Sequence, residues 1–304
     1  MAFLRMLEKI RIPGLNEFML GITYLGDEIA FLVIALIMFW CFDKRQGYYI
    51  LAVGFLGTIA NQFMKLYFRV LRPWDLDPNF TILEQAREGA GGYSFPSGHS
   101  QSSVGTFGGI ARVTKNKIVR WICIAFCILV PFSRMYVGVH TPLDVLVGSG
   151  MAVALVLILR PVIFAKDGKY IPAMLVVMTA AAIAYLCYVE FYPFPEDILQ
   201  ENLESGTKNA YTLLGALLGF LIVYFVDEKW LNFSVKAVWW AQILKVVIGL
   251  IIVLAIKEGL SAPLAALCGP YPGRLIRYFL IVIVAGIVWP LSFKWFSSLG
   301  KKEQ

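Results

Sequence analysis

The chain has 304 residues, of which 59% are hydrophobic and 15% charged, and its formal net charge is +7. A soluble globular protein carries about 25% charged residues, so this composition excludes an ordinary soluble domain and indicates an integral membrane protein. The positive charge does not indicate a nucleic-acid partner, because the basic residues are scattered over short connections and form no continuous basic face.

Apolar stretches long enough to cross a bilayer recur along the whole chain, since a spanning helix needs about 20 mostly apolar residues. The sequence therefore predicts an all-α, polytopic transmembrane helical bundle of about nine spans. Residues 2–24, which charged residues interrupt, predict an amphipathic helix along the membrane interface. The predicted spans are 26–42, 48–67, 96–113, 119–136, 142–164, 171–191, 209–226, 237–256 and 275–293.

Basic residues gather in alternate connections between these spans. Lys44, Lys115 and Lys166 lie in three such connections, and the positive-inside rule places them in the cytoplasm. The connections 68–95 and 137–141 then lie on the other side of the membrane. We therefore expect a multi-pass protein of the plasma (inner) membrane whose polar clusters face the extracytoplasmic side.

The chain contains only two histidines, and each lies in a polar cluster at the mouth of a predicted span. Histidine is the side chain whose unperturbed pKa, about 6.5, lets it act as base, nucleophile or acid near neutral pH. His99 belongs to the sequence 96–99 and His140 to the sequence 133–144, while a third cluster, 65–73, lies upstream. These three clusters are the candidate functional site.

The sequence Pro96-Ser97-Gly98-His99 is typical of a helix start, because Pro fits the first helical position. The N–H groups of Ser97, Gly98 and His99 would then point out of the helix end, where an anion binds readily. The alternative is an ordinary helix cap without a ligand.

The sequence Thr141-Pro142-Leu143-Asp144 also has two interpretations. Thr141 as N-cap with Asp144 three residues later is a common capping arrangement. Alternatively, Asp144 accepts a hydrogen bond from one nitrogen of His140, which fixes the tautomer and leaves the other nitrogen free to attack.

Cations accompany both histidines on the same side of the membrane. For any one of Lys65, Arg72 and Arg134, simple extension of a long side chain toward water is a sufficient explanation. Their convergence requires a counter-anion, and a phosphate group, with several acceptor oxygens, is the natural partner.

Taken together, Lys65-x6-Arg72-Pro73, 96–99 and Ser133-Arg134-x5-His140-x3-Asp144 resemble the three signature motifs of the type 2 phosphatidic-acid phosphatase superfamily. The resemblance covers roughly residues 15–165 and implies a metal-independent phosphomonoesterase with a compact helical core. It also implies roles for individual residues: His140 as nucleophile, Asp144 as its orienting group, His99 as acid and base, and Lys65, Arg72, Ser97, Gly98 and Arg134 as ligands of the phosphoryl oxygens.

We expect neither a cofactor nor a metal ion. No second carboxylate cluster resembles a divalent-metal site, and both histidines already have roles. The five cysteines show no CxxC spacing, so the sequence predicts neither a disulfide nor a cysteine metal site.

The expected function is hydrolysis of a lipid phosphate, with the bilayer as surroundings and the oligomeric state left open. One alternative is a phosphotransferase that passes the phosphoryl group to an alcohol, and another is a transporter or scaffold that binds an anionic lipid without cleaving it. The family's site also resembles that of vanadium haloperoxidases, but those are soluble proteins. We expect residues 1–165 to form the catalytic core and 166–304 to form an appended transmembrane region.

Overall fold

The computed structural model describes residues 1–87 and 89–299, and the described chain is entirely helical, without strands. It forms two compact units. The first consists of Met1–Ala35, Tyr49–Pro161 and Pro193–Gly206, and the second of Leu36–Tyr48, Val162–Tyr192 and the described residues from Thr207 onward. The prediction of an all-α fold is confirmed.

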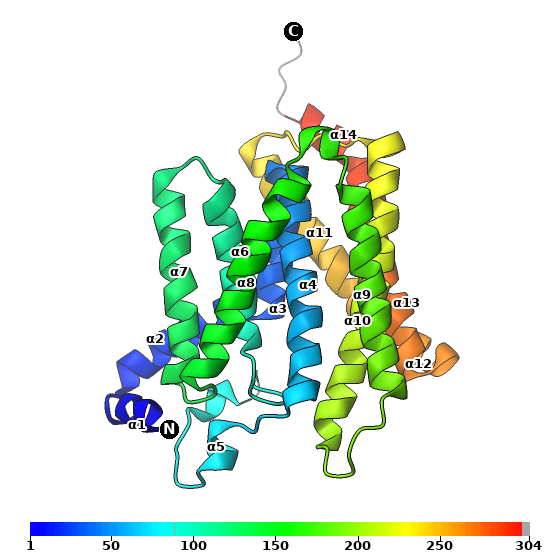
Figure 1. Cartoon of the computed structure of the whole chain (residues 1–304). Coiled ribbons are helices and arrows are strands. Elements are labelled where there is room, and N and C mark those ends of the chain that lie inside the picture. Colours follow the sequence, from blue (N-terminus) through cyan, green and yellow to red (C-terminus); the bar gives the residue numbers. More distant parts are fainter. Residues whose placement is uncertain (88, 300–304) are drawn as a thin grey trace. The chain divides into compact units, whose positions relative to one another are not determined.

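The first unit holds all three polar clusters, and within it α6 packs along α7 (Figure 1). Local signals set its helix starts. The side chain of Asn116 accepts hydrogen bonds from the first turn of α7, and Pro142 occupies the first position of α8. The helices that lie wholly or mostly in this unit are α1 (Ala2–Lys9), α2 (Pro13–Thr23), α3 (Glu28–Ile37), α4 (Lys44–Phe68), α5 (Pro73–Leu76), α6 (Gly98–Val113), α7 (Lys117–Tyr136) and α8 (Pro142–Ile163).

The second unit is organised around buried aromatic side chains. Trp40 is fully buried and donates its indole N–H to the carbonyl oxygen of Ala285 at 2.9 Å. The ring of Phe293 meets that of Trp40 edge to face, at 6.4 Å between centroids. Its helices are α9 (Ile171–Phe191), most of α10 (Gln200–Val226), α11 (Trp239–Gly259), α12 (Ser261–Cys268), α13 (Pro270–Ile283) and α14 (Phe293–Ser298).

By length and composition, seven helical segments of the described chain are able to cross a membrane, or eight if the bent pair Pro13–Gly26 and Glu28–Phe42 counts as one span. The predicted count of about nine spans is not confirmed. The predicted span 96–113 corresponds to α6, whose 16 residues are fewer than a helix needs to cross the bilayer. The predicted interfacial helix over 2–24 is divided into α1 and α2, and α2 belongs to the bent pair.

The N-terminal helix α1 forms an ion pair and a hydrogen bond with the connection between α4 and α6. Arg5 forms an ion pair with Asp77 at 2.6 Å, and the carboxylate of Glu8 accepts a hydrogen bond from the N–H of Thr81 at 2.9 Å. Burial raises the pKa of Glu8, but the hydrogen bonds from Thr81 and Arg5 outweigh burial and lower this pKa to about 2. The connection that carries Arg72 is thus fixed to the start of the chain.

Candidate active site

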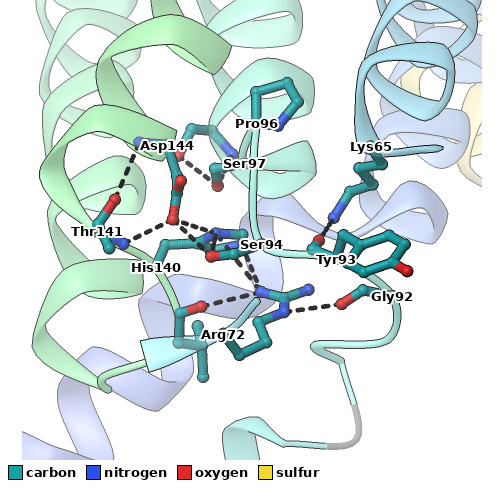
Figure 2. Close-up of polar contacts among 12 residues, drawn as sticks. Lys65, Arg72, Gly92, Tyr93, Ser94, Pro96, Ser97, His140, Thr141 and Asp144 are labelled. Atoms are coloured by element: carbon teal, nitrogen blue, oxygen red, sulfur yellow. Dashed lines mark hydrogen bonds and ion pairs between the residues drawn. The ribbon is translucent and has the colours of Figure 1, made fainter. Parts of the chain in front are cut away.

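The first unit brings the three polar clusters together at one end of its helices (Figure 2). Lys65 lies in the last turn of α4, and Arg72 immediately precedes α5. Ser97 caps α6, Arg134 lies near the end of α7, and Asp144 lies in the first turn of α8 beside His140. All six of these side chains are buried.

His140 and Asp144 are paired, and Asp144 also caps α8. Its Oδ2 lies 3.4 Å from Nδ1 of His140 and accepts a hydrogen bond from the N–H of Thr141 at 2.7 Å. The Thr141 hydroxyl in turn accepts the N–H of Asp144 at 3.3 Å. The capping interpretation of this sequence is therefore confirmed, and the same carboxylate lies close to the imidazole of His140.

Ser94 is a residue of this cluster that the sequence interpretation missed. Its hydroxyl donates to Oδ2 of Asp144 at 2.6 Å and lies 3.5 Å from Nδ1 of His140. Its position three residues before Ser97 is the only sequence signal, and no spacing rule connects it to Asp144.

Arg72 lies against the same imidazole, closer to Nε2 than to Nδ1, which is 3.5 Å from its Nη1. Its Nη1 lies 3.0 Å from Nε2 of His140 and donates to the carbonyl oxygen of Val139 at 2.9 Å. Its Nε and Nη2 donate to the carbonyl oxygens of Gly92 and Gly91. Backbone carbonyls from two connections therefore orient this cation against the ring.

Burial and the surrounding positive charges disfavour the protonated form of His140. Burial lowers the pKa of His140 well below its usual value, and the positive charges of Arg72, Arg134 and Lys65 lower this pKa further. His99 is also near enough for its charge to act in the same direction. A neutral imidazole has a free lone pair, which a nucleophile needs.

Arg134 is the most incompletely paired cation of the site. Its Nη1 donates to the hydroxyl of Thr23 at 2.7 Å, and its Nε and Nη2 are buried with no hydrogen-bond partner in the described part of the chain. These two groups form one edge of the guanidinium, the edge that binds two oxygens of a carboxylate or phosphate. A buried donor without a partner costs free energy, so this edge fits an anionic ligand.

The start of α6 differs from the prediction. We expected Pro96 at the first helical position, but α6 begins at Gly98, with Ser97 as N-cap accepting the N–H of Ser100 at 3.3 Å. The Ser97 N–H is not free, because it donates to the carbonyl oxygen of Asp144 at 3.0 Å. Gly98 and His99 are the first two residues of the helix, whose N–H groups have no intrahelical acceptor.

Lys65 and His99 complete the set of predicted residues. The ammonium group of Lys65 donates to the carbonyl oxygen of Tyr93. The side chain of His99 is 15% exposed, against 2% for His140, and its Nε2 lies 2.6 Å from Oδ1 of Asp27. The sequence interpretation missed Asp27, although an acidic residue at the outer end of the first predicted span was a usable signal.

Within residues 1–87 and 89–299, no cluster of metal ligands accompanies these residues. Among the described residues, no group of three or more His, Cys, Asp and Glu side chains has an arrangement able to hold a metal ion. The positive charge of the site comes from its lysine and arginine side chains.

The comparisons with known proteins define the class as a membrane lipid phosphatase. The chain belongs to the PAP2 superfamily: the model of this family matches residues 45–168, and that of the PAP2 superfamily phosphatase transmembrane extension matches residues 211–302. The resemblance given by the three motifs is confirmed, and the second match covers much of the appended region.

Three curated relatives are each similar to about half of the chain. Phosphatidylglycerophosphatase B of Bacillus subtilis is 31% identical over 164 residues, which is 50% of this chain and 76% of the relative. Undecaprenyl-diphosphatase BcrC of the same organism is 30% identical over 149 residues, 47% of this chain and 71% of the relative. Undecaprenyl-diphosphatase of Sulfolobus acidocaldarius is 28% identical over 141 residues, 45% of this chain and 66% of the relative. No solved structure matches the chain significantly.

Proposed function

We propose that this protein hydrolyses a phosphomonoester or diphosphate of a lipid through a phosphohistidine on His140, without a metal ion. The observation that carries the proposal is the pairing of both nitrogens of one buried ring. Nδ1 faces the Asp144 carboxylate, and Nε2 faces Nη1 of Arg72 at 3.0 Å. The attacking nitrogen therefore lies beside a cation suited to a phosphoryl oxygen.

The reaction has two steps. Nε2 of His140 attacks phosphorus, the bond from phosphorus to the leaving oxygen breaks, and His99 gives its proton to that oxygen. Water then attacks the phosphohistidine and loses a proton to His99, while the bond between phosphorus and Nε2 breaks and inorganic phosphate leaves. Asp144 holds the N–H of His140 throughout, which keeps the attacking lone pair on Nε2.

The chain's own cations supply the stabilisation that a metal ion supplies in other phosphatases. Lys65, Arg72 and Arg134 each bring a positive charge, and the free edge of Arg134 binds two oxygens at once. Phosphoryl transfer depends mainly on positioning and on stabilisation of charge on the equatorial oxygens. The Ser97 hydroxyl and the N–H groups of Gly98 and His99 add neutral donors to the same group.

The substrate is a lipid whose tail lies in the bilayer, and the relatives' names point to phosphatidylglycerol phosphate and undecaprenyl diphosphate as first candidates. We place the protein in the plasma (inner) membrane with the site on the extracytoplasmic side, as the charge bias of the connections predicts. In this proposal residues 1–165 carry out the chemistry, and 166–304 form the appended region.

The test is release of phosphate from a lipid panel by purified protein in detergent micelles, with His140→Ala as the blank. We expect turnover that chelators leave unchanged and vanadate inhibits, together with an acid-labile phosphoryl label on quenched wild-type protein only. Retained turnover in the folded His140→Ala protein would end the proposal. Phosphorylated alcohol in place of inorganic phosphate would establish the phosphotransferase instead.

A further inference from the structure

The N-terminal segment lies outside the family match at 45–168 and contacts His99, the proposed acid and base. Asp27 lies between a short helical turn, Tyr24–Gly26, and α3. Its Oδ1 is 2.6 Å from Nε2 of His99. The proposed reaction assigns His99 the proton transfers but does not involve Asp27.

The backbone around Gly26 allows the contact between Asp27 and His99. A Cβ atom on Gly26 would lie 3.0 Å from both Cβ and the carbonyl oxygen of His99 and 2.9 Å from Cγ1 of Val130. Glycine at this position therefore lets the turn approach α6 and α7 closely. The chain also bends by 57° here. Thr23, one turn earlier, accepts the hydrogen bond from Arg134, so the same segment contacts two groups of the site.

The charges around His99 explain how the Asp27 carboxylate affects the protonation of the ring. Burial is the main cause that lowers the pKa of His99, and the positive charges of Arg134 on α7 and Arg72 before α5 also oppose protonation of the ring. Asp27 supplies the opposing negative charge. An imidazole that donates a proton to a leaving oxygen must first hold that proton, and a carboxylate at 2.6 Å favours the protonated ring.

We propose that Asp27 is a positioning residue for His99 and that it makes His99 an effective acid, an inference that rests on the proposed function. Asp27 holds the N–H at Nε2, so Nδ1 faces the substrate. Nδ1 gives its proton to the leaving oxygen in the first step and takes one from the attacking water in the second. The proton on Nε2 stays in place in both steps.

Asp27→Asn tests this role, with Glu28→Gln as the matched control, because Glu28 is the neighbouring exposed acid. The assay compares an alkyl phosphate lipid with p-nitrophenyl phosphate, whose leaving group departs without a proton. For Asp27→Asn we expect kcat on the lipid to fall about tenfold or more, with a much smaller loss on the aryl ester. Equal losses on the two substrates would contradict the inference.

The pH profile gives a second readout that a purely structural role would not change. Removing the carboxylate charge makes His99 lose its proton at lower pH, so the alkaline limb of kcat on the lipid moves to lower pH in Asp27→Asn. Asp27→Glu, which keeps the charge, should recover part of the lipid rate. An unmoved limb in the folded Asp27→Asn protein overturns the inference.

His140→Ala in the same assays separates the two proposals. An active His140→Ala protein refutes the phosphohistidine reaction, whatever Asp27 does. An inactive His140→Ala protein together with a fully active Asp27→Asn protein leaves the reaction intact and refutes only the role of Asp27.

Discussion

Gly148 of α8 lies against the carbonyl group of Ser97, and a Cβ atom built on Gly148 would stand 2.5 Å from the Ser97 oxygen. Asp144, one turn earlier in α8, accepts a hydrogen bond at its carbonyl oxygen from the Ser97 N–H at 3.0 Å. Two of the three motifs are thus joined through the backbone, and the close approach depends on a glycine that belongs to neither motif.

Gly148→Ala should therefore displace Ser97 and destabilise the protein by about 1–3 kcal/mol, the usual cost of overpacking. Gly150→Ala is the matched control, because nothing lies within 4 Å of a Cβ atom at that position and alanine favours a helix over glycine by up to about 1 kcal/mol. Thermal unfolding in detergent and phosphate release measure both effects. Indistinguishable behaviour of the two variants would contradict the proposed packing.

Asp144→Asn removes the charge that faces Nδ1 of His140 while keeping the side chain's shape and one acceptor for the N–H of Thr141. We expect kcat to fall by about 10²- to 10⁴-fold, because the tautomer of the nucleophile is no longer fixed. Rapid quenching should show slower formation of the phosphorylated enzyme, with an unfolding temperature close to that of the wild type. Formation at the wild-type rate would assign Asp144 to helix capping alone.

Arg134→Lys keeps one positive charge but loses the two buried donors, Nε and Nη2, that have no partner within the described residues. A lysine cannot bind two oxygens in a fixed fork. We expect kcat/KM to fall by about tenfold or more and vanadate to bind more weakly, since a hydrogen bond to a charged group contributes about 1.5–3 kcal/mol. Unchanged vanadate inhibition would show that this edge does not contact the phosphoryl group.

The sequence predicted the residues that belong to the three motifs and missed two neighbours outside them, Ser94 and Asp27. His140 lies two residues before α8 and Asp144 lies in its first turn, so their proximity follows from their short separation along the chain. Ser94 and Asp27 reach these histidines through the folding of separate segments, which no spacing rule describes. The start of α6 was misplaced because the proline preference was weighed above the capping hydroxyl of Ser97.

Helix length and chain bending account for the difference between the predicted spans and the helices of the described chain. Hydropathy identified the seven long helical segments, since each is apolar enough on its own. The segment 26–42 was predicted as a separate span, but the structure bends the chain by 57° between Gly26 and Glu28 and pairs this segment with α2. Close packing of Gly26 against His99, which hydropathy does not record, accompanies that bend.

The pKa of His140 gives a further prediction. Because the chain has only two histidines, the NMR signal of this ring is easily assigned. Burial and the positive charges of Arg72 and Arg134 hold the pKa of His140 well below its usual value. The acid limb of kcat that reports protonation of this ring should therefore lie well below pH 6.5. Protein labelled with ¹⁵N-histidine and purified without a histidine tag gives two imidazole signals, and His99→Gln leaves only that of His140.

The sign of the effect on stability follows from the same pKa. Because the folded pKa of His140 is lower than the unfolded one, the unfolded chain binds more protons as the pH falls below about 6.5, and the free energy of unfolding decreases there. Arg72→Gln removes one of the cations, so the His140 signal should titrate at higher pH, whereas Lys9→Gln, an exposed change in α1, should leave it in place. A titration near pH 6.5 in the wild type would contradict the buried, cation-lined environment and with it the neutral nucleophile.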